Sequence, residues 1–194
     1  MTVEIIALFD MDDTLFDHNG QLISDLKKTQ KTEDPPITAS DVFSLPKYLI
    51  ERSHQIRGTR EWWANLPKFQ LGWDIWQIAE ELDFKREILT RANLKNPNMW
   101  SGKIDCIVKH FGYTIPPTIT ASLKSRHYGN LLVDDYPQYC LDWLSKRPRG
   151  LVIIPAHDYN KNFKHSQAIR YDGTNLGQVR EAMEKLKLSR MPKH

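Results

Sequence analysis

Two aspartates directly follow an apolar run near the start of the chain, Ile5-Ile6-Ala7-Leu8-Phe9. A short apolar run predicts a strand buried on both faces of a parallel sheet, and aspartate is a poor strand residue. We therefore expect the strand to end at Asp10, where ligands bind in open α/β sheets. With Met11 pointing elsewhere, Asp10 and Asp12 reach one small volume, where two carboxylates repel unless a cation lies between them. These oxygen ligands predict Mg²⁺.

The segment Asp10-Met11-Asp12-Asp13-Thr14 resembles the first motif, DxDx[TV], of the haloacid dehalogenase (HAD) superfamily of phosphotransferases. The resemblance implies that Asp10 is the nucleophile, which accepts the phosphoryl group as an aspartyl phosphate. It also implies that Asp12 is a general acid/base that offers its backbone carbonyl to the metal. A carboxylate can attack phosphorus if the charge of the phosphate is neutralised and the phosphate is held in line.

Three further segments match the remaining motifs of this superfamily, in the order that the family has them. A predicted strand ends at Thr90, whose hydroxyl would bind a phosphoryl oxygen. Lys103 follows a Ser-Gly pair at a predicted helix start, where backbone N–H groups also favour anions, and it would neutralise the phosphate and Asp10. A later apolar run ends in Asp134 and Asp135. One of these binds the metal and the other orients a water or a lysine, and the sequence leaves open which is which.

Strands and helices alternate along the rest of the chain. Further strands are predicted at 87–90, 118–121, 131–133 and 151–154. Helices are predicted at 72–82, at 98–111, around 139–144, and from residue 174 or 175 onward. This alternation predicts the α/β class with a parallel sheet covered on both faces, and the resemblance implies the three-layer, Rossmann-like form of the HAD fold. The polar stretch 158–172 is expected to be an exposed loop.

The segment after the first aspartate motif has a different character. It is polar, and short helices are predicted at 46–56 and 59–66. Its density of aromatic residues argues against a long disordered loop. The resemblance implies that residues 16–71 form a small helical type-1 cap over the active site, inserted into a catalytic core of residues 1–15 and 72–194.

The composition fits a small anionic substrate. The 194 residues include 27 basic and 24 acidic ones, a net charge of +3, which does not indicate a nucleic-acid partner. A nucleic acid would call for a basic track, and the lysines at 27–31 and 161–164 are too sparse for one. We expect Cys106 and Cys140 to be reduced core residues. The chain has no membrane-spanning run and no basic leader, so we expect a cytoplasmic protein.

A narrower resemblance, to the 5′(3′)-deoxyribonucleotidases, rests on the four motifs and on the aromatic cap. It implies a nucleoside monophosphate as the substrate, with the base held by aromatic side chains of the cap. Trp62 and Trp63 are the candidates for base stacking, although one of two neighbouring helical tryptophans should face the core. Asp13 departs from the pattern, because those enzymes commonly have glycine at this position.

Four basic residues are further candidates for contact with the substrate: Arg57, Arg60, Arg91 and Lys124. Arg57 and Arg60 flank the two tryptophans, and Arg91 follows Thr90. A solvated surface position is the alternative for all three arginines. Lys124 falls near a basic position that the nucleotidases use around the phosphate.

The sequence thus predicts an Mg²⁺-dependent phosphatase that hydrolyses (deoxy)nucleoside monophosphates through an aspartyl phosphate. One alternative keeps this chemistry and changes the substrate to nucleic-acid 3′ ends or another small phosphoester. Another is a catalytically silent binding protein on the same fold, because fold does not imply function. A homodimer is compatible with the sequence, which leaves open the base, the sugar and the choice between 5′ and 3′ phosphates.

Overall fold

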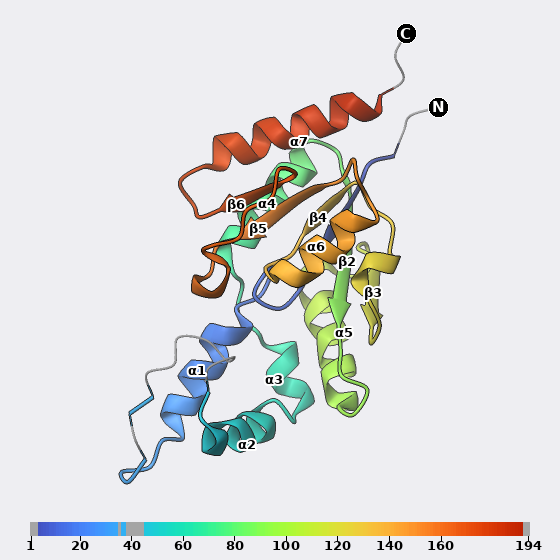
Figure 1. The fold of residues 1–194 in the computed structure, drawn as a ribbon. Coiled ribbons are helices and arrows are strands. Elements are labelled where there is room, and N and C mark those ends of the chain that lie inside the picture. Colours follow the sequence, from blue (N-terminus) through green and yellow to red (C-terminus); the bar gives the residue numbers. More distant parts are fainter. Residues whose placement is uncertain (1–3, 35, 38–44, 192–194) are drawn as a thin grey trace.

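The computed structural model describes residues 4–34, 36–37 and 45–191. Its described residues form one parallel sheet in the order β3-β2-β1-β4-β5-β6 (Figure 1). The strands are β1 (Ile6–Phe9), β2 (Lys85–Arg91), β3 (Pro117–Thr120), β4 (Leu131–Val133), β5 (Leu151–Pro155) and β6 (Ala168–Tyr171). The first strand therefore lies in the middle of the sheet, and Asp10 follows its carboxyl end.

Helices cover both faces of this sheet. The core helices are α4 (Gln70–Glu81), α5 (Pro97–Phe111), α6 (Pro137–Ser145) and α7 (Leu176–Arg190). Alternate side chains of a strand point to opposite faces. Ala7 and Phe9 accordingly join the cluster formed with α4, α5 and α7, whereas Leu8 and Leu132 join the cluster formed with α6. The predicted α/β class, with a parallel sheet between two helical layers, is confirmed.

Three helices form a separate lobe that we call the cap lobe: α1 (His18–Lys28), α2 (Lys47–Ile56) and α3 (Arg60–Ala64) (Figure 1). Its two linkers to the core run side by side. The Asp17 N–H donates to the carbonyl of Pro67 at 2.8 Å, and the Phe69 N–H donates to that of Leu15 at 2.9 Å. Residues 35 and 38–44 of this segment lie outside the described residues.

Close packing joins the cap lobe to the core at α3 and α5. Gly102 of α5 makes this possible, because a Cβ there would lie 2.4 Å from the Arg60 carbonyl oxygen and 2.6 Å from the Trp63 Cβ. Within the lobe, Leu22 and Leu26 of α1 pack with Leu49 of α2. The lobe thus has its own small apolar cluster and one tight contact with the core.

The structure departs from the sequence prediction in two places. The stretch 158–172, expected to be an exposed loop, contains a short 3₁₀ helix, η3 (Asp158–Asn160), and the edge strand β6. Asn160 in it is buried. Residues 18–28, for which no helix was predicted, form helix α1, in which Leu22 and Leu26 lie four residues apart on the buried face.

Two smaller predictions concern the cysteines and the membrane. Cys106 and Cys140 are both free and buried, as expected. Within the described part of the chain, none of the helices combines the length and the apolar character that crossing a bilayer requires.

Candidate active site

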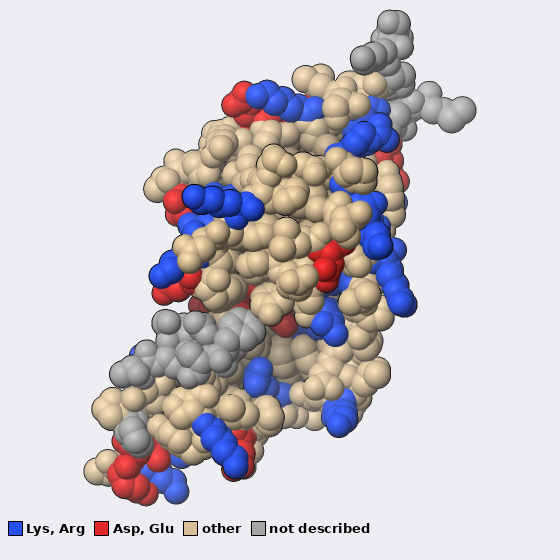
Figure 2. All heavy atoms as spheres, in the orientation of Figure 1, with Lys and Arg blue, Asp and Glu red and all other residues tan. Residues whose placement is uncertain are grey.

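The carboxyl ends of β1, β2 and β4 meet at a cavity of about 340 Å³ that opens between the core and the cap lobe. Figure 2 shows acidic side chains deep in the hollow between these two parts. The residues that line the cavity are Asp10, Asp12, Asp13, His18, Asn19, Arg57, Trp63, Thr90, Arg91, Met99, Lys124, Asp135, Tyr136 and Tyr139. Parallel strands end at one edge of a sheet, which is why residues so far apart in sequence meet here.

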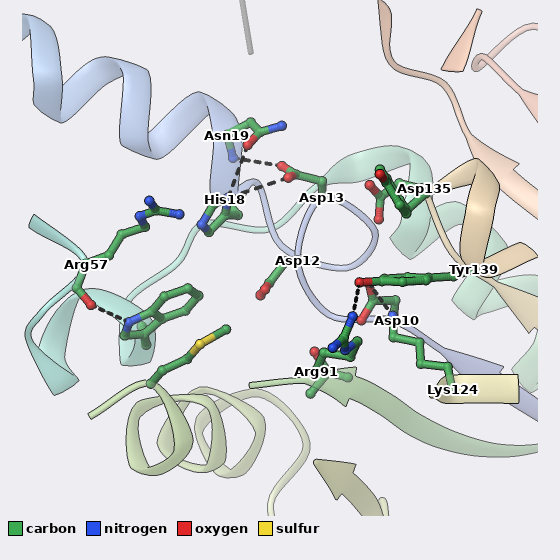
Figure 3. A pocket seen from close by; sticks show the side chains of 14 residues that line it. Asp10, Asp12, Asp13, His18, Asn19, Arg57, Arg91, Lys124, Asp135 and Tyr139 are labelled. Atoms are coloured by element: carbon green, nitrogen blue, oxygen red, sulfur yellow. Dashed lines mark hydrogen bonds and ion pairs between the residues drawn. The ribbon is translucent and has the colours of Figure 1, made fainter. Parts of the chain in front are cut away.

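A buried lysine lies beside the candidate nucleophile. The Lys124 Nζ is 2.7 Å from Asp10 Oδ2 and 2.7 Å from Asp134 Oδ2, and the side chain is almost completely buried (Figure 3). Burial lowers the pKa of Lys124, but the charges of Asp10 and Asp134 outweigh this and raise it. The lysine is therefore a permanent cation that holds the Asp10 carboxylate at the edge of the cavity.

Lys103 lies on the other side of the aspartate pair. Its Nζ donates to Asp12 Oδ2, to Thr90 Oγ1 and to the carbonyl of Arg91, each at 2.7 Å. The expectation that Lys103 stands at a helix start is wrong, because α5 begins at Pro97 and Lys103 is well inside it. Its contacts place it next to Asp12 and not next to Asp10. Burial raises the pKa of Asp12, but Lys103, together with other nearby cations, lowers it overall.

Three carboxylates lie together in the described part of the chain in a way that suits a cation. Ligand oxygens of Asp10, Asp134 and Asp135 all lie within 4.8 Å of one another. The Oδ1 atoms of Asp10 and Asp12 are buried without a hydrogen-bond partner. Burial, followed by the charge of Asp134, raises the pKa of Asp135 well above its usual range. A divalent ion would give the unpaired Asp10 oxygen a partner and would offset the repulsion that raises the pKa of Asp135. These residues therefore fit a metal.

The two neighbouring aspartates of this cluster have different surroundings. Asp134 is paired with a cation, because its Oδ2 accepts from Lys124, and its Oδ1 accepts from the Tyr136 N–H at 3.0 Å. The Asp135 oxygens accept from hydroxyl groups. Asp135 lines the cavity, and Asp134 does not. Asp135 is therefore the carboxylate placed to face a metal, and Asp134 the one that orients a lysine.

The cap lobe contributes Arg57 and Trp63 to the cavity. The Trp63 ring stacks on His18 at 5.4 Å between centroids, and its Nε1–H donates to the Arg57 carbonyl at 2.8 Å. The Arg57 guanidinium donates to the Ser53 carbonyl and hydroxyl. Burial lowers the pKa of Arg57. Among the described residues, no carboxylate lies within ion-pair distance of this cation.

The other two cap candidates do not line the cavity. The Trp62 Nε1–H donates to Asp25 Oδ2 of α1 at 3.0 Å, which ties α3 to α1. The exposed Arg60 donates to both carboxylate oxygens of Asp105 on α5, at 2.5 and 2.7 Å. These contacts join elements of the protein, so they give both side chains a structural role and not one in substrate binding.

Several cavity residues were not anticipated from the sequence. Tyr139 accepts a hydrogen bond of 2.5 Å from Arg91 Nη1, so it fixes the one arginine contributed by the core (Figure 3). His18 and Asn19 begin α1, a helix that the sequence did not predict. Tyr136 and Tyr139 could have been found, because both follow Asp135 within one helical turn.

Asp13 explains how the chain departs from the nucleotidase pattern. Its backbone has φ = +54°, the left-handed region that favours glycine. Aspartate tolerates this region better than most residues. Here the carboxylate accepts a hydrogen bond of 2.7 Å from the Asn19 N–H, at the start of α1. The aspartate therefore keeps the turn and ties it to the cap lobe.

Comparison with known proteins identifies the fold. No protein-family model matches the sequence, and no curated protein matches it. A protein from Burkholderia xenovorans described as a haloacid dehalogenase-like hydrolase superposes with a TM-score of 0.55 at 12% identity, over 94% of this chain and 98% of that one.

Two further solved structures are similar to a lesser degree. They are a hydrolase from Pseudomonas syringae (TM-score 0.47, 14% identity, 90% of this chain and 97% of that one) and a HAD-superfamily hydrolase from Ehrlichia chaffeensis (TM-score 0.48, 12% identity, 96% and 98%). From the first similarity and the sheet order we conclude that this chain has the fold of the haloacid dehalogenase-like hydrolases.

Proposed function

We propose that this protein is an Mg²⁺-dependent phosphatase that hydrolyses (deoxy)nucleoside monophosphates through an aspartyl phosphate. The observation that carries the proposal is the position of Asp10. Its carboxylate follows the central strand, lines the cavity, and is held by Lys124 next to Asp135. A carboxylate held by a lysine at a strand end suits nucleophilic attack on a phosphate.

Asp10 is the nucleophile in this proposal. One of its oxygens attacks phosphorus, and the bond between phosphorus and the ester oxygen breaks. Asp12, two residues on and also in the cavity, gives its proton to the leaving oxygen. In the second half Asp12 takes a proton from water, whose oxygen attacks phosphorus and frees the Asp10 carboxylate. The lowered pKa of Asp12 suits the second role, and the arriving phosphate charge raises it for the first.

Two lysines and a threonine stabilise the charge of the phosphate. Lys124 compensates Asp10, and Lys103 compensates Asp12 and positions the Thr90 hydroxyl. Asp10, Asp135 and the backbone carbonyl of Asp12 would hold Mg²⁺, which supplies further positive charge at the phosphate. Preorganised charge of this kind is the main source of rate enhancement in phosphoryl transfer.

Residues 16–71 act as the cap and select the leaving group. Trp63 lines the cavity with a ring that is otherwise buried and stacks on His18, and Arg57 presents a cation without a carboxylate partner among the described residues. A nucleoside suits this pair, because a base stacks on the ring and its carbonyl groups accept hydrogen bonds from the guanidinium. The volume of about 340 Å³ lies in the range of about 300–1,000 Å³ that is usual for small-molecule sites.

The test is phosphate release from a panel of nucleoside 5′- and 3′-monophosphates, p-nitrophenyl phosphate and a 3′-phosphorylated oligonucleotide, with Mg²⁺ and with EDTA. We expect nucleoside monophosphates to be the best substrates and EDTA to abolish turnover. Preference for the oligonucleotide would replace the substrate assignment. Failure to release phosphate from any ester would favour the binding-protein alternative.

The oligomeric state stays open, and the cytoplasmic location stays a prediction. Light scattering across a range of protein concentrations tests the first, and fractionation of expressing cells tests the second.

A further inference from the structure

A loop outside the four sequence motifs packs against the carboxyl end of the sheet, where the candidate site lies. It follows β5 and contains η3. Asn160 fixes it, because its Nδ2 donates to the carbonyls of Asp135 and Pro155, each at 2.9 Å. The Asn160 Oδ1 accepts from the His157 N–H at 2.9 Å and from Arg170 Nε at 3.1 Å. The Asn160 side chain is fully paired and buried, so the loop is held against the segment that carries Asp135.

Tyr159 of this loop contacts the Asp135 carboxylate directly. Its hydroxyl donates to Asp135 Oδ2 at 2.5 Å, while Thr14 Oγ1 donates to Asp135 Oδ1 at 3.0 Å. Each oxygen of the carboxylate thus has one hydroxyl donor, and the two donors lie far apart in the sequence. Hydrogen bonds of this kind set the orientation of a metal-binding carboxylate.

The Tyr159 ring belongs to a stack of three rings that reaches the cap linker. His157 lies against Tyr159 at 4.9 Å and 8° between planes, and Phe69 lies against the other face of His157 at 4.6 Å and 16°. His157 Nε2 is also 2.6 Å from the carbonyl oxygen of Asp13. Phe69 is part of the linker that returns from the cap lobe, where its N–H donates to the Leu15 carbonyl.

From this geometry we infer that Tyr159 is a positioning residue for the metal carboxylate of Asp135, and that the Phe69–His157–Tyr159 stack couples the cap linker to the metal site. The inference rests on the proposed function, because it takes Asp135 as a metal ligand. A shift of the linker would move Phe69, and contact through the stacked rings would then displace the Tyr159 hydroxyl. Coupling between two sites is reciprocal, so a bound metal also favours the linker position seen here.

Tyr159→Phe tests the positioning role, because it keeps the ring in the stack and removes only the hydroxyl. We expect Mg²⁺ binding, measured by titration calorimetry on the full chain, to weaken by about 10- to 100-fold. The matched control is Tyr171→Phe, which removes a hydroxyl bonded at 2.7 Å to Asp74, outside the cavity. The control should bind Mg²⁺ as the unmodified chain does. Equal Mg²⁺ affinity in Tyr159→Phe and the unmodified chain would overturn the positioning role.

The same calorimetry separates the inference from the proposed function. If the unmodified chain binds neither Mg²⁺ nor Mn²⁺, the metal site itself is wrong and both proposals fall. If the unmodified chain binds Mg²⁺ and Tyr159→Phe binds it equally, only the inference falls. Thermal unfolding of each variant confirms that the comparison is made between folded proteins.

Phe69→Leu tests the coupling, because it shortens the stack without touching Asp135. We expect a several-fold loss of Mg²⁺ affinity that is smaller than that of Tyr159→Phe. The matched control is Phe111→Leu, a ring that stacks on Trp73 at 5.1 Å in the core. Combining Phe69→Leu with Tyr159→Phe should weaken binding by less than the product of the two single effects, because both act on one hydrogen bond. Unchanged affinity in Phe69→Leu, or multiplicative effects in the double variant, would overturn the coupling.

Discussion

The core side and the cap side of the cavity differ in what holds their candidate residues. On the core side, Asp10, Asp12 and Thr90 follow or end strands, and two buried lysines fix them through bonds of 2.7 Å. On the cap side, a tryptophan and an arginine reach the cavity from short helices, while their near neighbours Trp62 and Arg60 bond elsewhere. The sheet fixes the proposed chemistry, whereas the rotation of small helices decides what the cap can select.

The largest effect should come from the nucleophile on the core side. Asp10→Asn keeps the size of the side chain and removes the attacking charge, so we expect turnover to fall by several orders of magnitude on every substrate. Lys124 keeps its ion pair with Asp134, so the unfolding temperature should change little. Steady-state kinetics on the purified variant measures this, with the surface change Asp142→Asn as the control. Near-normal turnover would remove Asp10 from the mechanism.

The next effect distinguishes the two lysines by the carboxylates that lose their cation when each lysine is replaced. Lys124→Met leaves two buried carboxylates, Asp10 and Asp134, without their cation. We expect turnover to fall by about 10²- to 10³-fold and the free energy of unfolding to fall by about 3–5 kcal/mol. Kinetics and chemical denaturation of the same preparation check both. A fully active Lys124→Met protein would mean that Asp10 does not depend on this lysine.

Lys103→Met should instead change how the rate depends on pH. Burial raises the pKa of Asp12 and Lys103 is the main group that lowers it, so removal of the lysine should raise this pKa. A larger fraction of Asp12 is then protonated at a given pH and cannot accept a proton from water. The acid side of the pH–rate profile should therefore move to higher pH. The pH–rate profile of Lys124→Met serves as the comparison. If the acid side of the Lys103→Met profile does not move, Asp12 is not the base.

The smallest effect concerns the cap side and applies to one substrate class. Trp63→Ala removes a ring that lines the cavity and also packs in the core, so it should lower stability as well. Base stacking is worth about 1–3 kcal/mol. Relative activity on a nucleoside monophosphate against p-nitrophenyl phosphate should fall by roughly 10- to 100-fold. Trp62→Ala should lower stability and leave the ratio unchanged, because Trp62 bonds to α1. Equal ratios in both variants would leave a phosphatase whose cap does not bind a base.

The fold and the core side of the cavity follow closely from sequence patterns. Continuous apolar runs identified β1 and β4 together with the acids after them, because a doubly buried strand leaves an unmistakable run. Edge strand β6 was missed, since Ala168 to Tyr171 is only partly buried and carries an arginine. Helix α1 was missed because its apolar positions are few and are flanked by charges.

The partners of the site residues could not be predicted with the same certainty. Lys103 and Lys124 both lie within reach of the aspartates, and only side-chain packing decides that Lys103 reaches Asp12 and Lys124 reaches Asp10. Arg57 and Arg60 are three residues apart, yet only Arg57 reaches the cavity. Tyr159 belongs to no recognisable motif, and its hydroxyl reaches Asp135 only because β5 lies next to β4. These contacts are long-range, and no local pattern encodes them.

The central claim is that Asp10 accepts the phosphoryl group, and capture of that group tests it most directly. The protein would be mixed with a nucleoside monophosphate and Mg²⁺, quenched rapidly in acid, digested, and analysed by mass spectrometry. We predict a phosphoryl adduct on Asp10, seen at early times, absent with EDTA and absent in Asp10→Asn. Phosphate release without any adduct on Asp10, or an adduct on another residue, would contradict the account.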